Sequence, residues 1–217
     1  MDGNGRWAAK RGLPRTVGHL SGLKSLRKVL LGSVRFNIPY LTLYCFSTEN
    51  WKRPTDEVNY LMGLFADKIY GELKFFNENG VKVLCIGRLE ALDEKIQKSI
   101  KLVETETQNN SKLTLQLAIN YGGQDEICEA VNKAIADGVK EITPSLLRSY
   151  FQHPEVPPVD LIARSAGEMR LSNFLLFDSA YAEFTFYDEL WPDWDEKMVE
   201  KLVMEYDNRD RRFGGLK

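Results

Sequence analysis

The chain has 217 residues, of which 43% are apolar and 28% charged, a length and composition typical of one globular domain with a sizeable core. Its 29 basic and 31 acidic residues give a formal net charge of −2, which argues against a nucleic-acid duplex or an anionic membrane as a partner, so any anion site has to be local. The lack of a long apolar run and of CxxC pairs argues against a membrane span, a disulfide framework and a zinc site, and we expect a cytoplasmic protein.

The first part of the chain alternates helical and strand patterns. Apolar residues recur at three- and four-residue steps from Leu20 to Val34, which predicts a helix. The aromatic-rich run 40–46 is too short for such a helix and predicts a buried strand. A second helix is expected from Pro54, with Thr55 as its N-cap, to just before Gly80. Its apolar stripe is broader than one sheet face needs and consists of Val58, Leu61, Met62, Leu64, Phe65, Ile69, Leu73 and Phe76.

The rest of the chain continues this alternation. Strands are expected at 81–86, 113–119, 159–163 and 183–187. Helices are expected after the first two of these strands, with inward faces formed by Leu92, Ile96, Ile100 and Val103 and by Ile127, Val131, Ala134 and Ile135. A closing helix is expected from near Trp191 to Gly214. This order predicts an α/β fold: a single domain over residues 1–217, with a mainly parallel central sheet flanked by helices.

Ligands of parallel α/β sheets bind beyond the carboxyl ends of the strands, so the chemistry is expected in loops. The first such segment is the start of the chain, MDGNGRW. Its two glycines permit a backbone whose N–H groups converge on an anion, Arg6 adds a cation, and Asp2 is an oxygen ligand suited to Mg²⁺. A tight turn at a chain terminus is the alternative interpretation, and this segment alone does not decide between them.

The second segment, 46–54, lies between a predicted strand and a predicted helix. Ser47, Thr48 and Asn50 can donate hydrogen bonds, Arg53 can pair with a phosphate, and the helix N-terminus beyond adds the positive end of its dipole. A capping segment with Trp51 packed on the surface is an equally good interpretation.

The third segment, 162–173, carries Arg164 and Arg170 among small residues that let a loop curl, which favours a diphosphate-binding loop. The alternative is a solvated loop in which Glu168 pairs with one of these two arginines. All three segments are expected at one end of the sheet and bring five arginines there: Arg6, Arg15, Arg53, Arg164 and Arg170. The residues therefore predict an enzyme or receptor for polyphosphorylated small molecules, with magnesium as a candidate cofactor.

Six sequence blocks resemble the bacterial undecaprenyl diphosphate synthases, which are cis-prenyltransferases. The blocks are MDGNGRWA at 1–8, FSTENWKRP at 46–54, AINYGG at 118–123, RSAGEMRLSNFLL at 164–176, AYAEF at 180–184 and WPDW at 191–194, followed by RRFGG at 211–215. They occur in the family's order over essentially the whole chain, which is far more specific than any single block.

This resemblance implies the repeated condensation of isopentenyl diphosphate onto an allylic diphosphate, with farnesyl diphosphate as the expected primer. The implied product is a long cis-polyprenyl diphosphate, the precursor of the lipid carrier for cell-wall glycan synthesis. The resemblance also implies Mg²⁺ as cofactor, a homodimer, and transient membrane contact for product release. It gives the broad apolar stripe of the helix after Pro54 a second interpretation, the wall of a hydrophobic tunnel, beside the more common one of a well-packed core helix. In such a dimer Arg209, Arg211 and Arg212 would reach the neighbour's site.

The family's residue roles carry over by position. Asp2 is implied as the catalytic carboxylate and, with Glu183, as a magnesium ligand. Asn50 is implied to assist proton removal from isopentenyl diphosphate, and we expect it to orient a phosphate oxygen or water, since a neutral amide is a poor base. The implied allylic diphosphate site consists of Gly3, Asn4, Gly5, Arg6, Trp7, Arg15 and His19. The other implied substrate-binding residues are Ser47, Thr48, Glu49, Trp51, Arg53, Arg164, Arg170, Leu171 and Ser172.

The chain departs from the family pattern at four places. Ala166 stands where family members usually have glycine, Gln124 replaces a common arginine, and Met169 stands where some members have a metal-binding histidine, so Met169 is left out of the metal set. The strand that precedes the aspartate motif in the family has no counterpart before Met1. Either the start lies upstream, or the terminus is held by loop contacts alone, in which case weak activity is expected.

Two other classes of function compete with the enzyme. A noncatalytic partner subunit of a prenyltransferase would lose the catalytic aspartate and the loop arginines, whereas this chain retains Asp2, Asn50, Arg53, Arg164 and Arg170. A nucleotide- or nucleic-acid-binding module is disfavoured by the absence of a GKS/T phosphate loop and a GxGxxG motif and by the net negative charge.

Overall fold

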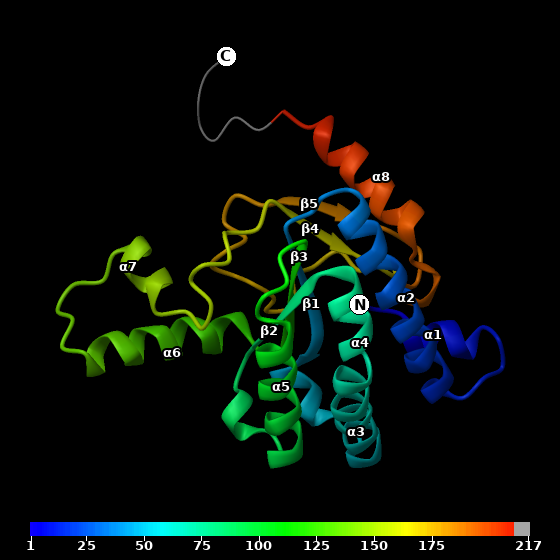
Figure 1. Ribbon diagram of the computed structural model, residues 1–217, viewed down its shortest axis with the longest axis horizontal. Helices are drawn as coiled ribbons and strands as arrows, with labels where there is room; N and C mark the ends of the chain where they lie inside the picture. Colours follow the sequence, from blue (N-terminus) through cyan, green and yellow to red (C-terminus); the bar gives the residue numbers. More distant parts are fainter. Residues whose placement is uncertain (211–217) are drawn as a thin grey trace. The chain divides into compact units, whose positions relative to one another are not determined.

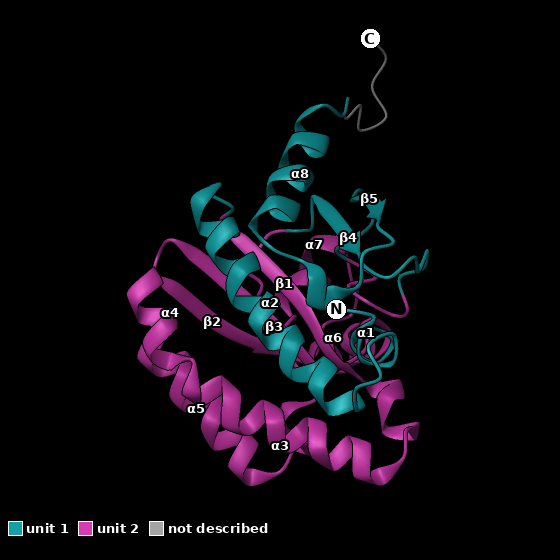
Figure 2. Cartoon of the chain, turned by 90° about the vertical axis from the view of Figure 1, so that its right-hand side faces the viewer, with its two compact units in different colours: residues 1–38, 158–171, 178–217 teal, residues 39–157, 172–177 magenta. Residues whose placement is uncertain are grey.

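A computed structural model describes residues 1–210 of the chain, and these form two compact units, which we describe separately (Figures 1 and 2). Unit 1 comprises residues 1–38, 158–171 and the described residues from 178 onward, and unit 2 comprises residues 39–157 and 172–177. The chain thus passes from unit 1 into unit 2 and back twice. The single domain over residues 1–217 stays a prediction.

Unit 2 is built on a parallel sheet whose three strands are β1 (Tyr40–Ser47), β2 (Val81–Ile86) and β3 (Leu113–Tyr121). The strand order is β1-β3-β2, with Tyr40 opposite Thr114 and Val81 opposite Leu113. The central strand β3 is buried along nearly its whole length, as expected for a strand that is covered on both faces. The three strands predicted in this part of the chain are confirmed.

The helical segments of unit 2 are η1 (Thr48–Lys52), α3 (Thr55–Gly71), α4 (Leu73–Asn79), η2 (Leu89–Ala91), α5 (Glu94–Thr107), α6 (Gly123–Ala136) and α7 (Pro144–Ser149). Helix α5 agrees with its prediction, because Ile96, Ile100 and Val103 are buried on it; Leu92 is buried as well but lies just before the N-cap, Asp93. The helix predicted after Pro54 is instead two helices, α3 and α4, since the first ends at Gly71, a residue with low helix propensity.

Three details of these helices correct the prediction. Thr55 is the first residue of α3, after Pro54, and is not the N-cap. Ile135 on α6 is 61% exposed, because the buried side of α6 is formed by Ala130 and Ala134. Helix α7 was not predicted; it begins with Pro144 at its first position, after Thr143, whose side chain accepts a hydrogen bond from Leu146 N–H.

Unit 1 contains α1 (Asn4–Ala9), α2 (Arg15–Arg35), β4 (Leu161–Arg164), β5 (Glu183–Phe186), η3 (Trp191–Asp193) and α8 (Glu196–Asp207). Strands β4 and β5 pair in parallel, with Leu161 opposite Glu183. The predicted α/β fold with parallel strands is confirmed, and the described strands divide into a three-stranded sheet in unit 2 and a two-stranded sheet in unit 1. None of the described helices is long and apolar enough to cross a membrane.

Helix α2 packs through small residues. A Cβ atom on Gly18 would lie 2.0 Å from the carbonyl oxygen of Asn4, and one on Gly32 would lie 3.0 Å from Cβ of Val199. These glycines therefore let α1 and α8 approach α2 closely. The prediction of a leucine face is partly wrong, because Leu20 is exposed and the buried face contains glycines and serines beside Val29 and Leu30.

Both ends of unit 1 differ from the prediction. The glycine-rich start is not a loop: Gly3 precedes a short helix, α1. The closing helix begins at Glu196, because Asp195 accepts hydrogen bonds from two backbone N–H groups of its first turn. It ends at Asp207, and its predicted end at Gly214 lies outside the described residues.

Candidate functional site

The residues predicted for the site fall into two groups, one in each unit. In unit 1, Asp2 is held from several sides. Its backbone N–H donates to Oγ of Ser165 at 2.9 Å, and its carbonyl oxygen accepts from Ser165 Oγ at 3.0 Å and from Trp191 N–H at 2.9 Å. Its carboxylate accepts a hydrogen bond from Nε of Arg164, the last residue of β4, at 2.9 Å. The Asp2 side chain is still 41% exposed, so the carboxylate is accessible from solvent.

A second carboxylate, Glu168, forms ion pairs with two further arginines of unit 1. Arg6 donates to Glu168 at 2.8 Å and to the carbonyl oxygen of Ala166 at 3.0 Å, and Arg170 forms an ion pair with the same carboxylate. The hydrogen bond from Arg170 holds the pKa of Glu168 below its usual value, and the charge of Arg6 acts in the same direction. Both guanidinium groups reach solvent, so both remain accessible to a further anion.

The expected pairing of Glu168 is therefore correct for Arg170 but not for Arg164. Arg164 instead binds the Asp2 carboxylate and donates to the carbonyl oxygen of Arg170. The alternative of an isolated solvated loop does not describe this arrangement, because Arg164 and Glu168 of the loop bind Asp2 and Arg6 at the start of the chain.

Positive φ angles shape the backbone of this group. Gly3 has a φ of +102°, and a Cβ atom there would lie 2.8 Å from Cδ2 of Leu190. Ala166, which stands where the family usually has glycine, has a φ of +71° and adopts the left-handed conformation that glycine tolerates best. The guanidinium of Arg15 lies against Gly5, since a Cβ atom there would be 3.3 Å from Cζ of Arg15.

The remaining predicted residues of unit 1 have other partners. Trp7 donates from its indole to Asp193 at 2.7 Å, and Arg11 lies over its ring at 4.0 Å. The Nδ2 group of Asn4 donates to the carbonyl oxygen of Met1 at 3.3 Å, while its Oδ1 atom is buried without a hydrogen-bond donor among the described residues. His19 lies half-buried on α2.

The predicted magnesium ligands were Asp2 and Glu183. Glu183 accepts a hydrogen bond from Arg209 at 2.7 Å. Within residues 1–210 no group of three or more His, Cys, Asp or Glu side chains is placed to hold a metal ion. Magnesium is commonly bound by one or two carboxylates together with substrate phosphates and water. The accessible carboxylate of Asp2 fits that donor set, in which a substrate phosphate would supply other oxygens.

In unit 2, the segment after β1 is the short helix η1, fixed by a reciprocal cap. The Ser47 side chain accepts from the backbone N–H of Asn50, and Oδ1 of Asn50 accepts from the backbone N–H of Ser47 at 3.1 Å. The amide oxygen of Asn50 is therefore engaged, and what this side chain can offer a ligand is its NH₂ donor.

Glu49 lies on the same segment and is tied to a distant part of the sequence. The side chain of Asn173 donates to Glu49 at 3.0 Å and accepts from Gln124 N–H, at the start of α6, at 2.9 Å. Burial acts to raise the pKa of Glu49, but hydrogen bonds from its own backbone N–H and from the side chains of Asn173, Ser47 and Thr48 outweigh it, and the pKa is lowered. Glu49 is therefore ionised at neutral pH.

The last predicted residues of unit 2 extend this group. Trp51 donates from its indole to Oδ1 of Asn120 at 2.7 Å, and Arg53 pairs with Glu57 at 3.2 Å. Ser172 belongs to unit 2, where its carbonyl oxygen accepts from the Tyr44 hydroxyl at 3.4 Å. Its sequence neighbours in the predicted isopentenyl pocket, from Leu171 back to Arg164, belong to unit 1.

Three residues that the sequence did not single out support these groups: Ser165, Asn120 and Asn173. Each uses its side chain to hold the backbone or side chain of a predicted site residue. The two asparagines adopt positive φ angles, +48° and +65°, and asparagine tolerates that conformation better than most residues. The residue types of Ser165, Asn120 and Asn173 did not predict this supporting role, because the residues that they hold are distant in sequence.

The fold and these groups define an α/β protein whose loops present accessible arginines and a carboxylate, an arrangement suited to diphosphate and its metal ion. Comparison with known proteins identifies the family within this class. The model of the family described as putative undecaprenyl diphosphate synthase matches residues 1–214. The chain therefore belongs to this family and is a prenyltransferase.

Individual relatives agree with this assignment. An isoprenyl transferase from Fusobacterium nucleatum is 49% identical over 217 residues, covering 100% of this chain and 94% of that protein. A trans,polycis-polyprenyl diphosphate synthase, (2Z,6E)-farnesyl diphosphate specific, from Thermobifida fusca is 47% identical over 99% of this chain and 78% of that protein. The crystal structure of a probable undecaprenyl diphosphate synthase from Campylobacter jejuni has a TM-score of 0.83 at 36% identity, covering 89% of this chain and 92% of that one.

Proposed function

We propose that the protein is a Mg²⁺-dependent cis-prenyltransferase that adds isopentenyl diphosphate repeatedly to farnesyl diphosphate. The product is a long cis-polyprenyl diphosphate, the precursor of the lipid carrier for cell-wall glycan synthesis. The observation that carries this proposal is the placement of Asp2: Ser165 and Trp191 bond its backbone, and its accessible carboxylate accepts a hydrogen bond from Arg164. The names of the relatives from Thermobifida fusca and Campylobacter jejuni support the substrate and the product class.

The arginines of unit 1 act on the diphosphates. Arg6, with the backbone of residues 3–5 and with Arg15, binds the allylic diphosphate, and Arg164 and Arg170, with Leu171 and Ser172, bind isopentenyl diphosphate. Breaking the allylic carbon–oxygen bond places negative charge on the departing diphosphate, so cations aimed there stabilise the transition state more than the ground state. Asp2, with Glu183 as the second proposed ligand, would hold Mg²⁺, which would add positive charge beside that group.

Asn50 orients the groups that remove the proton and does not itself accept it. Its amide oxygen already accepts from Ser47 N–H, so its NH₂ group donates to a diphosphate oxygen, which takes the proton from the condensing isopentenyl unit. Glu49, Trp51 and Arg53 complete this binding segment.

The growing hydrocarbon needs an apolar enclosure. The helix α3 carries more bulky apolar residues than its core contacts use: Leu61, Leu64 and Phe65 are only half-buried, whereas Val58 and Met62 are buried. We assign the half-buried residues to the wall of a hydrophobic tunnel.

The remaining features of the proposal concern the assembly. The enzyme is a cytoplasmic homodimer that touches the membrane transiently when product leaves. Arg209 contributes to the neighbour's site in this dimer, together with Arg211 and Arg212, which lie outside the described residues.

The alternative function is a noncatalytic partner subunit with the same fold. Such a subunit has no need to fix a carboxylate beside Arg164, so the hydrogen bonds of Asp2 favour the enzyme.

Incubation of the purified protein with farnesyl diphosphate, labelled isopentenyl diphosphate and Mg²⁺, followed by sizing of the extracted lipid, tests the proposal. We expect a ladder of products that ends in a long chain and disappears with EDTA. Asp2→Ala should abolish it, whereas Asp67→Asn should not, since Asp67 of unit 2 only forms an exposed ion pair with Lys95, at 3.0 Å. Absence of labelled lipid with the wild-type protein, or undiminished product in Asp2→Ala, contradicts the proposal.

A further inference from the structure

Asn120 occupies the carboxyl end of the central strand of unit 2. It is 4% exposed and has a φ of +48°, in the left-handed region. Since β3 lies between β1 and β2, its carboxyl end adjoins the ends of both neighbours. A residue at this point can therefore hold the segments that follow both outer strands.

The hydrogen bonds of Asn120 reach both of those segments. Its Oδ1 atom accepts from the Trp51 indole at 2.7 Å, in η1 after β1. Its Nδ2 group donates to the carbonyl oxygen of Arg88 at 2.9 Å, and its own carbonyl oxygen accepts from Arg88 N–H at 3.0 Å, in the turn after β2. A buried amide satisfied at both ends has one orientation, because turning it over would break both side-chain bonds.

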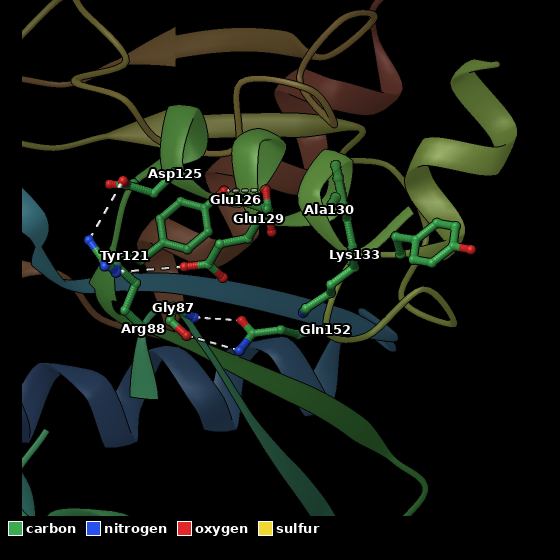
Figure 3. A pocket seen from close by; sticks show the side chains of 12 residues that line it. Gly87, Arg88, Tyr121, Asp125, Glu126, Glu129, Ala130, Lys133 and Gln152 are labelled. Carbon is green, nitrogen blue, oxygen red and sulfur yellow. Dashed lines mark hydrogen bonds and ion pairs between the residues drawn. The ribbon is translucent and has the colours of Figure 1, made fainter. Parts of the chain in front are cut away.

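The turn after β2 is a rigid support for Asn120. Figure 3 shows the Gln152 amide bonded to both polar groups of the Gly87 backbone, at 2.7 and 2.9 Å, and Arg88 directed toward Asp125 and Glu129. Gly87 has a φ of +123°, and a Cβ atom there would lie 2.1 Å from a carbonyl oxygen of β3. The turn thus has little freedom to move.

The small pocket drawn in Figure 3 is not a second substrate site. Its free volume is about 10 Å³, close to the least that one water molecule needs. A diphosphate cannot enter it, and its polar side chains serve mainly to hold the turn in place.

Trp51 connects η1 to Asn120 and so to the turn after β2. Its ring meets Phe46 edge-on, with centroids 5.3 Å apart, and the residue is 46% exposed. The reciprocal cap of Ser47 and Asn50 fixes the first turn of η1, and the bond from the Trp51 indole to Asn120 fixes the last. Without that bond, the aromatic contact alone would leave the ring free to slide.

We propose that Asn120 is a positioning residue for the condensation: it fixes Trp51, and through it the η1 segment that carries Asn50, against the turn after β2. This inference rests on the proposed function, because η1 is there assigned to isopentenyl diphosphate. Asn120 acts on the rate through the placement of Asn50 and does not touch substrate.

Steady-state kinetics of four variants test the proposal. Asn120→Gly suits the positive φ and removes both side-chain bonds, so kcat should fall about 10- to 100-fold, the scale of a displacement near 1 Å. Asn120→Asp retains an acceptor for the indole but loses the donor to the Arg88 carbonyl oxygen, so it should recover only part of that loss. Trp51→Phe should lower kcat, and adding Asn120→Gly to it should lower kcat little further.

Thr42→Val is the matched control. The Thr42 hydroxyl donates to Gln116 at 3.0 Å and links the same two strands, β1 and β3, away from their carboxyl ends. This variant should lose stability while kcat is retained. The proposal is overturned if kcat of Asn120→Gly equals that of Thr42→Val, if Asn120→Asp is as slow as Asn120→Gly, or if the Asn120 and Trp51 losses multiply.

Hydrogen exchange of the Trp51 indole N–H, followed by NMR, separates this proposal from the proposed function. The indole should be protected in the wild-type protein and in Thr42→Val and should exchange fast in Asn120→Gly, whether or not the protein elongates isoprenoids. Unchanged protection in Asn120→Gly overturns the proposed hold on Trp51. A wild-type protein that makes no product overturns the proposed function and with it the role in condensation.

Discussion

Replacing Ser165 by alanine tests the claim that Asp2 is fixed by the loop after β4. Ser165 is 2% exposed, and its hydroxyl both accepts from the N–H of Asp2 and donates to its carbonyl oxygen. In Ser165→Ala that carbonyl oxygen keeps its bond from Trp191 N–H, but the N–H of Asp2 loses its acceptor. Two lost bonds at about 1 kcal/mol each, one of which leaves a partly buried donor unpaired, give a loss of about 2 kcal/mol. For a chain of this size that corresponds to a fall in Tm of about 4–8 °C.

Thermal unfolding of three variants provides the assay. Ser33→Ala is the control, because Ser33 is 1% exposed but its hydroxyl only donates to Val29 within α2, so its removal leaves no donor unpaired and should cost under about 1 kcal/mol. Ser165→Thr keeps the hydroxyl and should stay close to wild type in Tm and in activity. Equal losses in Ser165→Ala and Ser33→Ala, or full condensation activity in Ser165→Ala, would refute the reasoning.

Three further predictions concern titratable groups. A thiol reagent at pH 8 should label only Cys128 in the native protein and all 3 cysteines in denaturant. Cys128 is exposed, whereas burial raises the pKa of Cys45 to about 12 and that of Cys85 well above its usual value. Rapid labelling of a second thiol in the native protein contradicts this prediction. Burial also raises the pKa of Glu104, which accepts from Cys85 N–H at 2.8 Å, so the charge of Glu104 costs stability above pH 4.5. Glu104→Gln should therefore raise Tm at pH 7 by a few degrees, under about 1 kcal/mol, and this gain should vanish near pH 4. An equal gain at both pH values counts against the prediction. Asn173→Ala removes a hydrogen bond that lowers the pKa of Glu49. The pH-dependent part of the lost stability, under about 1 kcal/mol for this exposed group, should therefore be present at pH 7 and disappear as the pH falls below 4.5. Urea unfolding at pH 7 and pH 3 measures this loss, and an equal loss at both pH values argues against the assigned bond.

The elements that could be predicted are those whose apolar pattern is decided locally. Strand β3 places Leu113, Leu115 and Leu117 at alternate positions, and the inward residues of α5 recur at helical spacing, so both predictions hold. The face of α2 could not be predicted in the same way. It is buried through Gly18, Gly22 and Gly32, and their role follows from partners that the hydrophobic pattern does not reveal.

The site shows the same division. The sequence pointed to the arginines and to Asp2 because ligands of parallel α/β sheets bind beyond the carboxyl ends of the strands, where these segments were expected. It left the partner of Glu168 open, since sequence spacing alone cannot choose among several arginines, and the structure adds Arg6, 162 residues away. Ser165, Asn120 and Asn173 were missed because a polar side chain that holds other groups in place reveals its role only through those groups.

The central claim is that the held carboxylate of Asp2 takes part in breaking the allylic carbon–oxygen bond. Rapid-quench measurement of the first condensation, with farnesyl diphosphate, labelled isopentenyl diphosphate and Mg²⁺, tests it in a single turnover. We expect Asp2→Asn, which keeps the size of the side chain but not its charge, to slow this step by about 10²- to 10³-fold while the protein stays folded. A first condensation as fast in Asp2→Asn as in the wild-type protein would contradict the account.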